Sequence, residues 1–180
     1  MVTHDATPPR GDLEFGTIAA LPRIAASRWG DRVAIEDGDV CLTFDDLDRL
    51  AVRVAGSLIA AGVAEGDRVG IWAPNGWRWI VAALGVHIAG AAVIPLNTRY
   101  KAREAADILA RGKARALFTV NGFLGADYVA ALDALGGDCP PLALRVVMQG
   151  TAPDGCDTWD EFIGRGARSE EHTSELQSPC

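Results

Sequence analysis

The chain has 180 residues, of which 49% are hydrophobic, and its formal net charge is −7. This length and apolar content fit one globular domain or part of a larger one, and the acidic balance argues against a nucleic-acid surface, which needs clustered Lys and Arg. Four cysteines without a CxxC pair, and without a histidine at ligand spacing, argue against a structural metal site and favour a reduced, cytoplasmic protein.

Two stretches bear on targeting and membrane insertion. The opening 15 residues lack the basic start and apolar run of a signal peptide, so we expect no secretory leader. The segment from Trp79 to Leu96 is apolar enough to be mistaken for a membrane span, but it contains His87, two glycines and Pro95. We therefore expect a buried helix followed by a buried strand, and no transmembrane segment.

The first elements in chain order are a short helix and a hairpin. Residues 1–16 are rich in Pro, Gly and Asp and are expected to form a flexible arm. A helix is predicted from residue 17 to Gly30, with an apolar face made by Ile18, Leu21, Ile24 and Ala25. Residues 32–36 and 40–43 are predicted strands around Asp37-Gly38-Asp39, because Asp-Gly between β-formers is typical of a hairpin.

A long helix is predicted next. Thr43 is its expected N-cap, with Asp46 three residues later as an approximate capping box, and Gly62 ends it. Apolar residues recur at helical spacing without a break, at Leu47, Leu50, Ala51, Val54, Ala55, Leu58 and Ile59. The strand predicted at 68–73 is apolar enough to be buried on both faces.

The rest of the chain alternates helices with strands. Asn75 is the expected cap of a helix whose inner face is formed by Trp77, Ile80, Val81, Leu84 and Ile88. Further elements are predicted in the order buried strand 91–96, helix 101–111, strand 116–120, weak helix 126–135 and strand 144–148. This order, with short connections, predicts an α/β fold with a mostly parallel sheet covered by helices.

The usual motifs for catalysis or phosphate binding do not occur. The sequence has no GxGxxG after its first strands and no GxxxxGK[ST], GxSxG or HExxH. His87 is interpreted as a satisfied core histidine rather than a base. Three carboxylates are interpreted as favourable charges in the first turn of a helix, namely Asp45, Asp46 and Asp48. Three tryptophans would suit an aromatic pocket and are explained equally well by packing, namely Trp72, Trp77 and Trp79.

Two ordered groups of residues resemble a known family. Residues 42–47, LTFDDL, followed by 66–71, GDRVGI, are similar to the opening of adenylate-forming enzymes, the acyl-CoA synthetase superfamily. Residues 90–100, GAAVIPLNTRY, look like a later segment of the same family. The resemblance covers about residues 17–148. It implies that 17–150 form the N-terminal subdomain of the large domain of an acyl-CoA synthetase, with a loop and short helix at 151–167.

Within this superfamily the sequence looks like bacterial acyl-CoA ligases. It resembles fatty acyl-CoA ligases and, most nearly through residues 123–128, actinobacterial ligases that activate ring-bearing propanoates in steroid breakdown. The resemblance implies an acid–thiol ligase that uses ATP, Mg²⁺ and coenzyme A to convert a small-molecule carboxylic acid into an acyl-adenylate and then a thioester. The family's catalytic groups would follow Gly150, so the chain as given is expected to be catalytically incomplete.

One binding residue is carried over from the family. Arg99 matches an arginine that in some relatives lies near the nucleotide of coenzyme A, and a guanidinium suits phosphate recognition. The alternative is that Arg99 pairs with a neighbouring carboxylate or caps the helix region. No catalytic residue and no metal ligand is predicted in the chain.

The closing residues do not match the family. Residues 168–178, RSEEHTSELQS, equal the translation of a standard short-read sequencing adapter, so 168–180 are predicted to be a non-native tail, with a genuine disordered tail as the alternative. A second interpretation of the whole chain is a self-contained doubly wound nucleotide- or ligand-binding module without enzymatic activity, which the alternation also allows. The sequence leaves the acyl substrate and the oligomeric state open.

Overall fold

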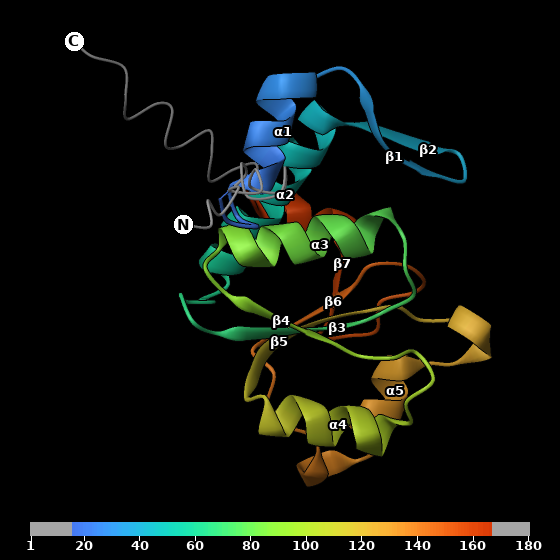
Figure 1. Ribbon diagram of the computed structural model, residues 1–180. Coiled ribbons are helices and arrows are strands. Elements are labelled where there is room, and N and C mark those ends of the chain that lie inside the picture. Colours follow the sequence, from blue (N-terminus) through green and yellow to red (C-terminus); the bar gives the residue numbers. More distant parts are fainter. Residues whose placement is uncertain (1–15, 167–180) are drawn as a thin grey trace, which may run out of the picture.

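The computed structural model describes residues 16–166 of the chain (Figure 1). Residues 1–15 and 167–180, which hold almost all of the predicted arm and the predicted non-native tail, lie outside the described residues. Within the described part, no helix has the length and apolar character that crossing a membrane requires.

A five-stranded parallel sheet forms the centre of the fold. Its spatial order is β4-β3-β5-β6-β7, which is the order of doubly wound folds whose ligands bind where the chain reverses direction across the sheet. The strands are β3 Arg68–Trp72, β4 Ala92–Pro95, β5 Ala114–Thr119, β6 Leu144–Val147 and β7 Asp157–Thr158. The predicted α/β fold with a mostly parallel sheet is confirmed.

Helices cover both faces of this sheet. Figure 1 shows α2 and α3 on one face and α4 and α5 on the other, with α1 packed against α2. The helices are α1 Leu21–Trp29, α2 Phe44–Ala60, α3 Trp77–Ile88, α4 Ala102–Arg111 and α5 Tyr128–Asp133, with 3-10 turns η2 Phe123–Gly125 and η3 Gly136–Asp138. Residues 159–166 are also helical.

The core lies around the two central strands. Ile71 and Trp72 of β3 and Leu117 and Phe118 of β5 are at most 1% exposed, because each strand is flanked by neighbours and covered on both faces. Burying a side chain of this size contributes about 1.5–3 kcal/mol. The predicted burial of β3 on both faces is therefore confirmed.

The hairpin and the long helix form as their local sequences predict. Strands β1 Val33–Asp37 and β2 Val40–Thr43 pair antiparallel in a separate small sheet. Gly38 turns the chain between them with φ +57°, a conformation that glycine adopts at no steric cost. Thr43 caps α2, and its hydroxyl accepts from the backbone N–H of Asp46 while the Asp46 carboxylate accepts from the backbone N–H of Thr43.

Several apolar residues predicted on inner helix faces are exposed. Ile59 and Ile80 are 59% and 39% exposed, although Leu58 and Val81 beside them are fully buried. Neighbouring residues on a helix point about 100° apart, so one residue of each pair turns to solvent. Ile18 is 56% exposed because it precedes the first turn of α1, which begins at Leu21.

Two further predictions are wrong in detail. The strand predicted as buried at 91–96 is β4, an edge strand with half-exposed residues, and Pro95 is tolerated because an edge strand need not donate every ladder bond. The N-cap of α3 is Gly76 rather than Asn75, and neither side chain caps the helix. The carboxylate of Asp37 instead accepts from the N–H of Trp77 at 2.9 Å.

Residues 151–166 contain the predicted loop and short helix, and they also supply a strand and two core side chains that were not predicted. β7 adds a strand beside β6, and the helical residues Trp159 and Phe162 are 3% and 0% exposed. The buried hydroxyl of Ser57 in α2 donates to the carbonyl of Phe162 at 2.6 Å and accepts from the N–H of Gly166 at 2.9 Å. This segment is therefore fastened directly to α2.

Candidate functional site

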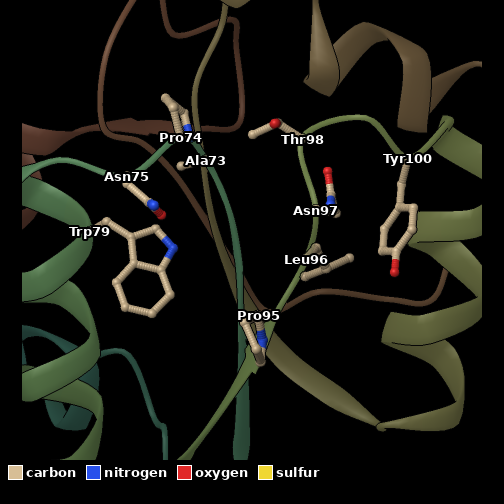
Figure 2. A pocket seen from close by; sticks show the side chains of 9 residues that line it. All are labelled: Ala73, Pro74, Asn75, Trp79, Pro95, Leu96, Asn97, Thr98 and Tyr100. Atoms are coloured by element: carbon tan, nitrogen blue, oxygen red, sulfur yellow. The ribbon is translucent and has the colours of Figure 1, made fainter.

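A hollow of about 500 Å³ lies at the carboxyl ends of β3 and β4. In open parallel sheets, ligands bind at the carboxyl edge, and the point where the strand order reverses lies between β3 and the neighbouring β5. The cavity is lined by residues of the β3–α3 loop, α3, the end of β4 and the segment after it, namely Ala73, Pro74, Asn75, Trp79, Pro95, Leu96, Asn97, Thr98 and Tyr100 (Figure 2).

Two aromatic side chains frame this cavity. Figure 2 shows Trp79 on one side and Tyr100 on the other side of the segment that runs from Pro95 to Thr98. Asn75 and Asn97 add amide groups that can donate and accept hydrogen bonds. The arrangement suits a ligand with flat or apolar parts and a few polar groups.

Two buried side chains donate hydrogen bonds to the backbone of the turn that follows β4. Nε1 of Trp72 donates to the carbonyl of Asn97 at 3.0 Å, and the hydroxyl of Tyr128 donates to the carbonyl of Thr98 at 2.9 Å. Within the turn, the Asn97 side chain accepts from the N–H of Arg99 at 2.9 Å. The Tyr128 hydroxyl is protonated at neutral pH and can donate, and burial raises its pKa above the ordinary value.

A smaller hollow of about 150 Å³ lies at the carboxyl ends of β3, β5 and β6. Asp37 and Arg78 bring charge to its lining, and the Arg78 guanidinium lies 4.3 Å from the ring centroid of Trp77. Asp37 already occupies the N-terminus of α3 through its bond to the N–H of Trp77. The positive end of α3 is therefore satisfied by the protein's own carboxylate.

Arg99 is exposed in the turn between Thr98 and Tyr100, which both line the larger cavity. Among residues 16–166, its guanidinium has no hydrogen-bond or ion-pair partner; only its backbone N–H is bound, to Asn97. The alternative pairing of Arg99 with a neighbouring carboxylate is thus absent from the described part of the chain. A role in binding coenzyme A stays a prediction.

The other candidate residues divide into structural and cavity-lining groups. Asp45 and Asp46 lie in the first turn of α2 as predicted, whereas Asp48 lies beyond the first turn, 4.0 Å from Arg23. Of the tryptophans, Trp72 is 1% exposed and packs edge-on against Tyr128, whereas Trp79 lines the cavity. The packing interpretation therefore holds for Trp72, and the pocket interpretation holds for Trp79.

His87 differs from its interpretation as a satisfied core histidine. It is half-buried in the last turn of α3, and its ring makes no hydrogen bond with any residue from 16 to 166. No group of His, Cys, Asp and Glu in that same range could hold a metal ion. The described residues that line the larger cavity include no His, Cys, Asp or Glu, and the amides of Asn75 and Asn97 can bind and orient a ligand.

Comparison with known proteins gives a consistent set of relatives. A family model described as "AMP-binding enzyme" matches residues 23–172. Two proteins, from Mycobacterium tuberculosis (strain ATCC 25618 / H37Rv) and Rhodococcus jostii (strain RHA1), are 48% identical over 149 residues and 43% identical over 150 residues. Both are named 3-[(3aS,4S,7aS)-7a-methyl-1,5-dioxo-octahydro-1H-inden-4-yl]propanoyl:CoA ligase.

The matches cover most of this chain and a small part of each relative. They cover 83% and 82% of the chain, whereas the chain spans only 28% and 29% of the two relatives' length. The crystal structure of the anthranilate CoA ligase AuaEII in complex with anthranoyl-AMP matches with a TM-score of 0.75 at 23% identity, over 83% of this chain and 28% of that chain. This likeness shows that the two share a fold.

Proposed function

Because the chain belongs to the AMP-binding enzyme family, we propose that it forms part of an ATP-dependent ligase that joins a carboxylic acid to coenzyme A. The observation that carries this proposal is the 48% identity over 149 residues to a relative named as such a ligase. The resemblance to adenylate-forming enzymes predicted from residues 42–47, 66–71 and 90–100 is confirmed by the family match.

The proposed acid is a propanoate that carries a fused ring system. The names of both actinobacterial relatives specify a propanoyl group on an octahydro-indene, which is two fused rings. Such an acid has a bulky apolar body and a single carboxylate, so the enzyme must provide a wide apolar pocket. Medium-chain fatty acids are the natural comparison, since a relative at 29% identity is named a medium-chain acyl-CoA ligase.

The proposed cofactors are ATP, Mg²⁺ and coenzyme A. The carboxylate would displace pyrophosphate from ATP to give an acyl-adenylate, whose acyl group then passes to the thiol of coenzyme A. The described residues fit a contribution to binding, because an exposed guanidinium at Arg99 lies at the carboxyl edge. They supply no metal-binding cluster, so we assign Mg²⁺ to the nucleotide phosphates rather than to residues 16–166.

We also propose that the enzyme works in the cytoplasm. Cys41, Cys139 and Cys156 are free thiols in the described structure, which is usual for proteins in a reducing compartment. The remaining catalytic groups are proposed to belong to the part of the ligase that corresponds to the relatives' other residues, and 17–150 to their N-terminal subdomain.

A self-contained ligand-binding module is the second candidate function. The strand order β4-β3-β5-β6-β7 favours it, because folds with this order bind ligands at the same edge without further domains. It predicts that the 180-residue chain binds ATP or AMP unaided, which calorimetric titration would detect. The ligase proposal predicts no such binding by this chain alone.

The ligase proposal is tested with the complete reading frame from the source genome. Purified enzyme is given ATP, Mg²⁺ and labelled pyrophosphate, with an indenyl propanoate, a medium-chain fatty acid or no acid. We expect acid-dependent incorporation of label into ATP, with the ring-bearing propanoate preferred, and thioester formation when coenzyme A is added. Absence of acid-dependent exchange with every carboxylate would refute the ligase function.

Arg99 is proposed to contact the phosphates of coenzyme A. In the complete ligase, Arg99→Ala should raise the KM for coenzyme A about tenfold, the scale of one charge-assisted hydrogen bond, and leave pyrophosphate exchange unchanged. Arg111→Ala is the matched control, because Arg111 is an exposed arginine at the opposite end of α4, paired with Asp107. An unchanged KM in Arg99→Ala would contradict the assignment.

A further inference from the structure

The turn that carries Arg99 is held by hydrogen bonds from core residues to its backbone. The carbonyl of Asn97 accepts two hydrogen bonds, from the N–H of Tyr100 and from Nε1 of Trp72, both at 3.0 Å. Just before the turn, the N–H of Leu96 donates to the carbonyl of Ile71. The base of the turn is thus closed, while Arg99 at its tip is exposed.

The two side chains that reach the turn from the core form one unit. Trp72 and Tyr128 are 1% and 5% exposed, and their rings meet edge-on with centroids 4.4 Å apart. They come from different elements, the end of β3 and the start of α5, and donate to adjacent carbonyls, those of Asn97 and Thr98. We name this pair the turn clamp.

Building on the proposed ligase function, we propose that Trp72 and Tyr128 are positioning residues for coenzyme A, because they fix the Asn97–Thr98 backbone and so hold the backbone of Arg99 in one place. A loop that is already ordered loses less conformational entropy when a ligand binds, and affinity rises accordingly. The clamp therefore acts on coenzyme A through Arg99, without touching the ligand.

A purely structural role for these two residues predicts a different result. Both belong to the main hydrophobic core, so any loss at these positions also lowers stability. A general loss of stability changes both half-reactions together, whereas a loss of turn positioning affects only the step that uses coenzyme A. The two half-reactions therefore separate the roles.

The experiment compares three single variants of the complete ligase. Tyr128→Phe removes one hydroxyl and keeps the ring, and should raise the KM for coenzyme A about fivefold, the scale of one hydrogen bond, with pyrophosphate exchange unchanged. Trp72→Phe should act in the same direction. Ser57→Ala is the control, because it removes a buried hydroxyl that bonds residues 162 and 166 instead of the turn, and the KM should stay unchanged.

Two further measurements make the result specific. In an Arg99→Ala background, Tyr128→Phe should add no further rise in KM, because the clamp acts through Arg99. Backbone amide exchange over residues 97–101 should be faster in Tyr128→Phe and unchanged in Ser57→Ala. An unchanged KM in both clamp variants, or a parallel fall in pyrophosphate exchange, would overturn the proposal. If the wild-type enzyme shows no acid-dependent pyrophosphate exchange, the ligase function is refuted instead. In that case the clamp is tested separately by amide exchange over residues 97–101, and a rate in Tyr128→Phe no faster than in the wild type would refute it.

Discussion

The carboxylate of Asp37 accepts a hydrogen bond from the backbone N–H of Trp77 at 2.9 Å, although the two residues are 40 positions apart. Asp37 ends β1 in the hairpin, and Trp77 begins α3. Since the N-cap Gly76 has no side chain to satisfy this N–H, the hairpin supplies the missing cap. The same helix carries Trp79, so the hairpin supports a wall of the candidate site.

Replacing this remote cap should destabilise the protein. Asp37→Ala leaves the N–H of Trp77 to solvent and removes a carboxylate from the positive end of α3, which should lower the free energy of unfolding by about 1 kcal/mol. Urea unfolding followed by tryptophan fluorescence measures the change. Asp39→Ala, in the same hairpin turn, is the control and should have little effect. Equal losses in the two variants would contradict remote capping.

The capping box of α2 should make stability depend on pH. The pKa of Asp46 lies below its ordinary value of 3.8, first because the backbone N–H of Thr43 donates to its carboxylate and then because Arg49 pairs with it at 2.6 Å. A lowered folded pKa means that this stabilisation is present above about pH 4 and is lost as the pH falls through the folded pKa. Stability should therefore decrease below about pH 4.

Asp46→Asn should flatten this dependence. The free energy of unfolding is measured by urea titration from about pH 6 to about pH 3 in both proteins, and the variant should lose less stability on acidification than the wild type. Asp39→Asn is the control, because the Asp39 carboxylate has no hydrogen-bond partner among residues 16–166. If the free energy of unfolding of Asp46→Asn fell with pH as steeply as that of the wild type, carboxylates other than Asp46 would be responsible for the loss of stability in acid.

Local patterns in the sequence predicted the elements of this fold, and long-range contacts explain what they missed. The Thr43–Asp46 box and the Asp37-Gly38 turn were predictable because all their partners lie within a few residues. The Trp72–Asn97 and Tyr128–Thr98 bonds join residues 25 and 30 positions apart, and no periodicity encodes such pairs. The Ser57–Phe162 bond spans 105 positions, so the fastening of residues 151–166 was equally hidden.

The sequence indicated which segment contributes to the candidate site but not which side chains line its cavity. The family resemblance singled out residues 90–100 and Arg99 within them, and the structure places this segment beside the larger cavity at the carboxyl ends of β3 and β4. The roles of the tryptophans depended on burial, because Trp72 and Trp79 are seven positions apart and face different surroundings. Sequence patterns place residues on elements, and only packing decides which of them line a cavity.

The three described cysteines should differ in reactivity. Cys41 is exposed on β2, whereas burial raises the pKa of both Cys139 and Cys156, which lowers the fraction of reactive thiolate at neutral pH. Brief treatment of the native protein with iodoacetamide, followed by peptide mass spectrometry, should show Cys41 modified well before the other two. Under denaturing conditions the order should disappear, and equal rates in the native protein would contradict the described burial.

Gly85 of α3 packs directly against Val54 and Ala51 of α2, and an added methyl group has no room there. A Cβ at Gly85 would lie 2.5 Å from Cβ of Val54 and 2.9 Å from the carbonyl oxygen of Ala51, and neither atom can rotate away. The helix-propensity gain of alanine over glycine is about 1 kcal/mol, whereas overpacking of a dense core costs about 1–3 kcal/mol. The clash should prevail, and Gly85→Ala should destabilise the protein.

Gly164 provides the matched control for this substitution. It also lies in a helical segment, but a Cβ there would meet no atom within 4 Å. Gly164→Ala should therefore stabilise the protein by about 0.5–1 kcal/mol through the loss of backbone freedom in the unfolded chain. Urea unfolding of both variants tests the opposite signs directly. If Gly85→Ala were as stable as Gly164→Ala, α2 and α3 would have to be farther apart than the structure places them, because only separation could make space for the methyl group.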